Sequence, residues 1–346
     1  MDTITILKPD DMHVHLRQGE PAADYLRDSA RYTGRIVVMP NTKPPVTSVR
    51  RYKEYREEIL RYRDRERLEI DPLFAFQIVP ELDRKELSQL KRFGAVCGKY
   101  YPLGVTTNSD TGVADTESIY PVFSLMEELG IVLSIHGELP GAPVMERETA
   151  FLPVFRNITE RFPGLRIIYE HVSTKEAMEL VNSCGENTAA TITPHHLLKN
   201  IDDMAGALFR PSLFCKPVLK GRADMEFLRE EVLGGNPKVF YGSDSAPHPA
   251  ERKKSDAVPA GVYSSPSGIP ALAGFIFDRA GVKKGKELIE NFCSKRGAIF
   301  YGLEPATGTL TLERRPWKVP DEISGCIPFC RGEEILWHAS GINDLG

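Results

Sequence analysis

Short apolar runs alternate with longer amphipathic stretches along most of this chain. The amphipathic stretches include residues 48–67, 115–130 and 221–235, and the last two end in glycine, as helices often do. Runs rich in valine, isoleucine and aromatic residues indicate buried strands. There are eight such runs, at residues 12–15, 35–39, 73–79, 95–101, 131–138, 166–172, 188–194 and 238–244. Eight strands joined by crossover helices predict an α/β fold of the (β/α)8 or TIM-barrel type.

The length of 346 residues fits either two average domains or one large barrel. No linker, low-complexity tract or internal repeat divides the chain. After about residue 302 the sequence is rich in turn residues and short apolar pieces. We therefore expect a single barrel domain over residues 1–346 with a C-terminal appendage.

Composition and charge indicate what kind of molecule the protein binds and where it is found. The net charge of −4 argues against a nucleic-acid-binding protein and favours a small-molecule partner. The six cysteines form no C-x-x-C pair, so neither a disulfide framework nor a cysteine zinc site is indicated. With no signal peptide and no segment that could span a membrane, the sequence predicts a cytoplasmic protein.

The first predicted strand ends in an unusual group of polar residues, "DMHVHLR". In a strand His13 and His15 point to one face, and Arg17 follows on the same side. This stretch by itself fits a metal-binding pair and a pair of hydrogen-bonded histidines equally well. The residues at the ends of the other predicted strands distinguish between these two interpretations.

Polar residues recur where other predicted strands end. In a TIM barrel the carboxyl ends of the strands meet in one pocket. The candidates are His13, His15, Lys99, His136, His171 and Asp244. Taken singly, each histidine could be a core residue, Asp244 a helix N-cap, and Lys99 a surface residue. One shared site explains all of them, and imidazole and carboxylate groups predict a metal such as zinc.

Lys99 needs a separate explanation because an ammonium group cannot coordinate a cation. Reaction of the neutral amine with carbon dioxide gives a carbamate, whose two oxygen atoms can each bind one metal. Lys99 is therefore a candidate carboxylated lysine that bridges two ions, and two such ions can share a hydroxide nucleophile at neutral pH.

Taken in order, the motifs "DMHVHLR", "MPNTKPP", "GKYYPLGVTTNS", "SIHGE", "YEHVST", "TITPHHL", "CKPVLK" and "YGSDSAPH" make the chain similar to a known family. It resembles the dihydroorotases of the amidohydrolase superfamily, in particular their compact, single-function type. The resemblance extends from about residue 9 to "EEILWH" near the C-terminus. The H-x-H motif is common in the superfamily, whereas "TTNS" together with "DSAPH" is much more specific.

The resemblance implies a binuclear zinc centre. One zinc would be bound by His13, His15, carboxylated Lys99 and Asp244, and the other by Lys99, His136 and His171. Asp244 would be the catalytic acid and base, moving a proton between the bridging hydroxide and the leaving nitrogen.

The resemblance also implies a set of substrate contacts. These are Arg17, Asn41 and His248, backbone groups near Lys216 and Ala260, and a mobile loop with Thr106 and Thr107. Lys216 departs from the bacterial members compared, which have an apolar residue there. A contact through the backbone would tolerate this change, but its effect on affinity stays open.

The implied reaction is the reversible cyclisation of N-carbamoyl-L-aspartate to L-dihydroorotate, the third step of pyrimidine synthesis, by a protein that is a homodimer. A metal hydroxide suits an amide-type ring bond, and Arg17 suits an anionic substrate. One rival is a hydantoinase or allantoinase with the same metals. The other is a non-catalytic scaffold, which should have lost metal ligands, and this chain has lost none.

Overall fold

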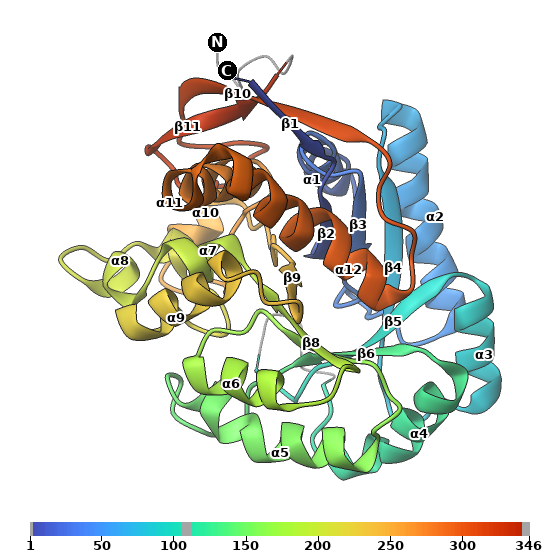
Figure 1. The fold of residues 1–346 in the computed structure, drawn as a ribbon. Helices are drawn as coiled ribbons and strands as arrows, with labels where there is room; N and C mark the ends of the chain where they lie inside the picture. Colours follow the sequence, from blue (N-terminus) through green and yellow to red (C-terminus); the bar gives the residue numbers. More distant parts are fainter. Residues whose placement is uncertain (1–2, 106–111, 341–346) are drawn as a thin grey trace.

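A closed ring of parallel strands forms the centre of the molecule (Figure 1). The computed structural model describes residues 3–105 and 112–340. The strands follow one another around the ring in chain order. They are β2 (Asp10–Val14), β3 (Arg35–Val38), β4 (Asp71–Gln77), β5 (Ala95–Tyr100), β6 (Val132–His136), β7 (Ile167–Glu170), β8 (Thr188–Ile192) and β9 (Val239–Tyr241). A bridge between Val14 and Ser245 joins the two ends, so the predicted (β/α)8 barrel is confirmed.

Helices surround this ring on the outside (Figure 1). The longer ones are α1 (Pro21–Ala30), α2 (Val49–Glu66), α3 (Arg84–Arg92), α4 (Tyr120–Leu129), α5 (Arg147–Arg161), α6 (Lys175–Ser183), α9 (Arg222–Leu233) and α11 (Gly268–Glu290). Shorter pieces are α7 (Pro194–Leu198), α8 (Ile201–Ala205), α10 (Ala250–Lys253), α12 (Arg296–Tyr301), two 3-10 turns (Thr116–Ile119 and Pro211–Leu213) and a π-helical turn (Asn291–Lys295). None of the helices in the described ranges has the length and apolar character needed to cross a lipid bilayer.

The predicted helices at 48–67 and 221–235 correspond to α2 and α9. The stretch 115–130 differs, because a 3-10 turn over Thr116–Ile119 precedes the α-helix. Pro121 explains the division, since proline fits the first turn of an α-helix but would break its interior. The α-helix accordingly begins at Tyr120, directly before the proline.

Successive strand residues pack into two different cores. Val37 belongs to the cluster inside the barrel, which α12 closes with Ala298 and Tyr301, whereas Val38 packs toward the helices. This alternation is the period of two expected of a strand. In β2 the register shifts between Asp11 and Val14, so Met12 lies in the inner cluster and Val14 in the outer one.

The segment after residue 302 pairs with the start of the chain. β10 (Thr309–Lys318) lies between β1 (Thr3–Leu7) and β11 (Glu334–Ala339) in an antiparallel sheet (Figure 1). The sheet packs on α11, where the rings of Phe277 and Trp337 are 5.0 Å apart. The sequence analysis did not anticipate β1, whose partner strand lies at the other end of the chain.

Gly98, which precedes Lys99 in β5, tests how tightly the barrel is packed around this strand. A Cβ atom at Gly98 would lie 2.8 Å from Phe76 Cζ and 2.9 Å from Met126 Cε. We expect Gly98→Ala to lower the free energy of unfolding by about 1–3 kcal/mol, measured by urea denaturation. Gly185→Ala is the control, because a Cβ at Gly185 would meet nothing within 4 Å. Equal stability of the two variants would contradict this account.

Candidate active site

The candidate metal ligands come together at the carboxyl ends of the barrel strands. His13 lies in β2 and Lys99 in β5, and His136 is the last residue of β6. His171 and Asp244 follow β7 and β9. All of these side chains are buried. Because parallel strands end at one rim, positions far apart in the sequence meet there.

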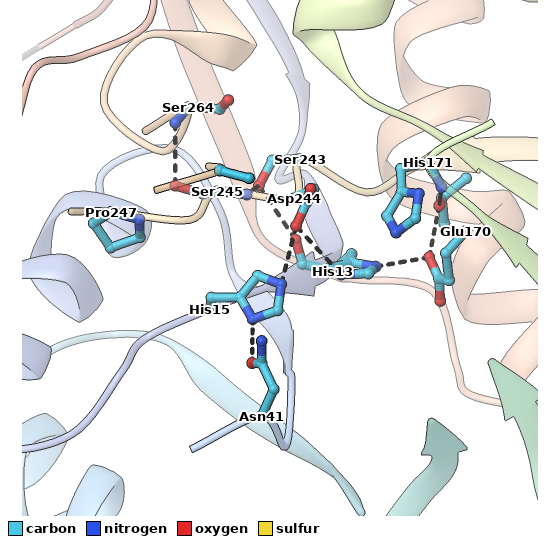
Figure 2. Close-up of polar contacts among 12 residues, drawn as sticks. His13, His15, Asn41, Glu170, His171, Ser243, Asp244, Ser245, Pro247 and Ser264 are labelled. Atoms are coloured by element: carbon cyan, nitrogen blue, oxygen red, sulfur yellow. Dashed lines mark hydrogen bonds and ion pairs between the residues drawn. The ribbon is translucent and has the colours of Figure 1, made fainter. Parts of the chain in front are cut away.

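Asp244 lies between the two histidines of the H-x-H motif (Figure 2). Its Oδ1 atom is 3.0 Å from His15 Nε2 and 3.5 Å from His13 Nε2. One donor atom from each of the three residues lies within 4.8 Å of the others. β2 ends at Val14, so His15 projects from the following loop but still reaches the site. Two imidazoles and a carboxylate are suitable ligands for a divalent ion.

A second group of donors continues from the first. The ring centroids of His13 and His171 are 5.2 Å apart, and those of His171 and His136 are 4.7 Å apart. Lys99 Nζ and His171 Nδ1 are buried and have no hydrogen-bond partner among the described residues. Buried polar atoms without partners are costly. Metal ions, with Lys99 converted to an anionic carbamate, would give both atoms a role, so these side chains fit a metal centre.

Hydrogen bonds fix the orientation of the histidine rings. His13 Nδ1 lies 2.8 Å from Glu170 Oε2, and His136 Nε2 lies 2.6 Å from Glu138 Oε2. Each ring therefore keeps its other nitrogen for the centre, as metal-binding histidines usually do. Sequence analysis missed both glutamates. The signal was their position, since Glu170 directly precedes His171 and Glu138 follows His136 by one glycine.

Asn41 holds the His15 ring in the same way, with Oδ1 2.6 Å from His15 Nδ1 (Figure 2). This contact places Asn41 beside a candidate metal ligand. Its expected contact with the substrate is a separate role that stays a prediction.

Glu170 accepts hydrogen bonds from three other strands. Besides His13, it accepts hydrogen bonds from Ser134 Oγ at 2.5 Å and Thr191 Oγ1 at 2.6 Å. Burial would raise the pKa of Glu170, but the neighbouring His13 and Lys99 and the hydrogen bonds from His13 and Ser134 lower it to about 2. Glu170 is therefore a buried anion at neutral pH.

The protonation states suit metal binding. Burial lowers the pKa of His15 to about 4 and that of His171 well below its usual value, so both rings are neutral at pH 7. Burial also lowers the pKa of Lys99, which favours the neutral amine that carbon dioxide can attack. Burial would raise the pKa of Asp244, but its hydrogen bond to His15 and its interactions with the neighbouring histidines hold it well below its usual range.

Three site residues have left-handed backbone conformations. The φ angles are 61° at Arg17, 42° at His171 and 45° at Asp244. Non-glycine residues adopt this region rarely, and it persists only where the surroundings enforce it. At His171 the backbone N–H donates to Thr191 Oγ1 at 2.7 Å. The strand ends are thus bent locally, in a way that alternation along a strand does not predict.

Arg17 and His248 meet at the rim of the site. Arg17 Nε donates to Pro247 O at 3.1 Å, and its Nη2 lies 3.1 Å from His248 Nε2. His248 Nε2 also lies 3.0 Å from Ala260 O. The structure therefore brings together three of the predicted substrate contacts.

The expected substrate contacts near Lys216 and in the loop with Thr106 and Thr107 are not part of this group. Lys216 is partly buried; burial lowers the pKa of its side chain, while the charge of Glu138 acts to raise it. The Lys216 side chain is therefore within electrostatic reach of the buried Glu138. The predicted loop residues Thr106 and Thr107 lie outside the described residues.

A second buried cluster has metal-ligand chemistry, formed by His195, His196 and Cys215. His196 and Cys215 form hydrogen bonds, whereas His195 Nε2 is buried with no hydrogen-bond partner among the described residues. His196 Nδ1 lies 2.8 Å from Thr193 Oγ1, and its Nε2 lies 3.0 Å from Pro217 O. Cys215 Sγ donates to the same carbonyl at 3.2 Å. We interpret this cluster as a hydrogen-bonded part of the core.

Comparisons with known proteins show which family and fold the chain matches. Residues 10–185 match the amidohydrolase family model. A dihydroorotase of Shewanella woodyi is 41% identical over 97% of this chain and 99% of its own length. A dihydroorotase structure from Campylobacter jejuni has a TM-score of 0.89 at 35% identity, covering 98% of each chain. The Saccharomyces cerevisiae dihydroorotase in complex with 5-fluoroorotic acid has a TM-score of 0.88 at 32% identity, also over 98% of each.

Glu170→Gln tests the support of the His13 ring. A neutral amide stabilises the ring less than a carboxylate, so we expect metal affinity to fall about 10- to 100-fold. Chelator competition followed by elemental analysis would measure this change. Glu176→Gln on the exposed face of α6 is the control. Unchanged affinity in Glu170→Gln would show that this hydrogen bond does not support metal binding.

Proposed function

Because this chain belongs to the dihydroorotase family of the amidohydrolases, we propose that it interconverts N-carbamoyl-L-aspartate and L-dihydroorotate, the third step of pyrimidine synthesis. The observation that carries the proposal is the position of the Arg17 guanidinium at the rim of a buried cluster of histidines and Asp244. A cation beside a metal-type site suits a small anionic substrate whose amide bond is made or broken.

The buried donors can hold two divalent ions, which we infer to be zinc. The first set is His13, His15, Lys99 and Asp244, and the second is Lys99, His136 and His171. When bound, such ions lower the pKa of water and polarise a carbonyl group. Lys99 can serve both sets only as a carbamate, formed when its neutral amine adds carbon dioxide and releases one proton. The complete burial of Lys99 and its lowered pKa support this modification.

Asp244 is the group that we infer moves the proton. In ring closure the terminal carbamoyl nitrogen bonds to the side-chain carboxyl carbon, and one carboxyl oxygen leaves as water. The nitrogen gives up one proton and the leaving oxygen needs two, so one proton comes from solution. Asp244 is ionised at neutral pH, and its carboxylate can accept the nitrogen's proton and deliver it to the oxygen. Hydrolysis follows the reverse course.

The substrate keeps one carboxylate in both compounds, and Arg17 is the group that we infer binds it. Pro247 O and His248 hold the guanidinium in place, so it is preorganised for a carboxylate. The remaining proposed contacts are Asn41, His248, the backbone near Lys216 and Ala260, and the loop residues Thr106 and Thr107.

Two further properties belong to the same proposal. We infer a homodimer, to be tested by light scattering of the purified protein. We also infer a cytoplasmic enzyme, which the six free cysteines support because reducing compartments keep thiols free. A hydantoinase-like enzyme is the competing proposal, and a substrate panel separates the two.

Lys99→Ala tests the bridging role. We expect the wild-type enzyme to hold about two metal ions per chain, since these ligands exceed the needs of one tetrahedral ion. The variant should lose metal and activity, and short carboxylic acids should restore part of both. Elemental analysis and turnover measure these outcomes. Full wild-type activity with one ion per chain would exclude the binuclear centre.

The reaction itself is tested by incubating the enzyme with each compound and following ultraviolet absorbance. The ring should gain about tenfold over the open form for each unit of pH decrease, because closure consumes one proton in the range where both carboxylates are ionised. Asp244→Asn should abolish both directions without moving the equilibrium. Conversion of a hydantoin or allantoin, with neither proposed compound converted, would replace the proposal with its competitor.

A further inference from the structure

Lys253 is a buried lysine with every donor engaged. It is the last residue of α10, and only 3% of its surface is exposed. Its Nζ donates to Gly261 O at 2.8 Å, Pro259 O at 3.0 Å and Phe214 O at 3.2 Å. An ammonium group has three N–H donors, and each one here has a carbonyl acceptor.

The acceptors belong to two segments far apart in the sequence. Phe214 stands two residues before Lys216, and Pro259 and Gly261 flank Ala260. These are the two segments whose backbone groups we proposed as substrate contacts. A hydrogen bond from Gly261 N to Phe214 O, at 2.9 Å, also joins them. Lys253 therefore lies behind both segments and connects them.

The same arrangement continues to the proposed carboxylate-binding group. Ala260 O lies 3.0 Å from His248 Nε2, and Arg17 Nη2 lies 3.1 Å from the same nitrogen, which either donates to the carbonyl or accepts from the guanidinium. Gly261 packs closely against a neighbouring segment in a conformation that suits glycine, since its φ is +147° and a Cβ there would lie 2.5 Å from Ala246 O. A shift of residues 259–261 would therefore also displace His248 and, through it, Arg17.

A lysine in this place is costly, which argues for a specific role. Burial lowers the pKa of Lys253 to about 8, which shows that its surroundings disfavour the charge. An apolar side chain would pack here without that cost, but it could not bind three carbonyl oxygens.

We propose that Lys253 is a positioning residue that holds the backbone at Lys216 and Ala260 in the geometry that binds the substrate. This inference rests on the proposed function. It predicts that Lys253 contributes to binding of both the cyclic and the open compound, without contacting either and without affecting the metal centre.

The test compares three variants of the full-length, metal-loaded enzyme. Lys253→Met removes the donors, and Lys253→Arg keeps the charge in a planar group that cannot direct three N–H bonds to these carbonyls. Lys254→Met changes the exposed neighbour and is the control. We expect KM for both compounds to rise about tenfold in the Met and Arg variants while kcat changes less than about threefold, the pattern of lost uniform binding. Metal content and the control should match the wild type.

Other results would overturn the inference. A purely structural lysine would lower the melting temperature or the active fraction but leave KM unchanged. A wild-type KM in Lys253→Arg would show that charge, not the three hydrogen bonds, matters. If Lys253→Met does not fold, the KM of Lys253→Arg decides. Failure of the wild-type enzyme to convert dihydroorotate would instead reject the proposed function.

Discussion

The Glu170 carboxylate is the constraint on which the site depends. It lies in β7 and binds His13 of β2, Ser134 of β6 and Thr191 of β8, so one buried anion connects four strands of the barrel. A buried carboxylate is tolerated only when its oxygens are satisfied. Satisfying Glu170 fixes the His13 ring and links the end of β7 to β2, β6 and β8, next to the remaining donors.

Departures from regular strand geometry also help to position the side chains of the site. The register shift in β2 and the left-handed conformations at Arg17, His171 and Asp244 turn side chains away from the paths that ideal strands would give them. Such conformations are unfavourable by themselves and require a rigid surrounding. The barrel supplies that rigidity, since successive strands are hydrogen-bonded from β2 to β9 and a bridge between Val14 and Ser245 joins the two ends. Backbone conformations that would be costly in a free loop can therefore hold these side chains at the site.

Different interactions organise the rim of the site, where Arg17 lies, and its floor, which consists of the buried histidines and Asp244. At the floor, carboxylates orient imidazoles, and burial keeps His15 and His171 neutral. At the rim, backbone carbonyls orient cations: Pro247 O binds Arg17, and three carbonyls bind Lys253. The floor thus carries donors suited to metal ions, while at the rim the Arg17 guanidinium is suited to an anion and Lys253 lies buried behind it, an arrangement that suits hydrolytic chemistry on a small acid.

The sequence alone determined the barrel and the identity of the candidate ligands. Eight apolar runs with helices between them specify a parallel barrel, and residues at the ends of its strands, such as His136 and Asp244, must share one rim. Only the tertiary structure showed Glu170 and Glu138 behind the histidines, Lys253 behind the rim, and the pairing of β1 with β10. Hydrogen bonds and strand pairs between distant segments leave no periodic signal in the chain, so their partners become known only when the chain is folded.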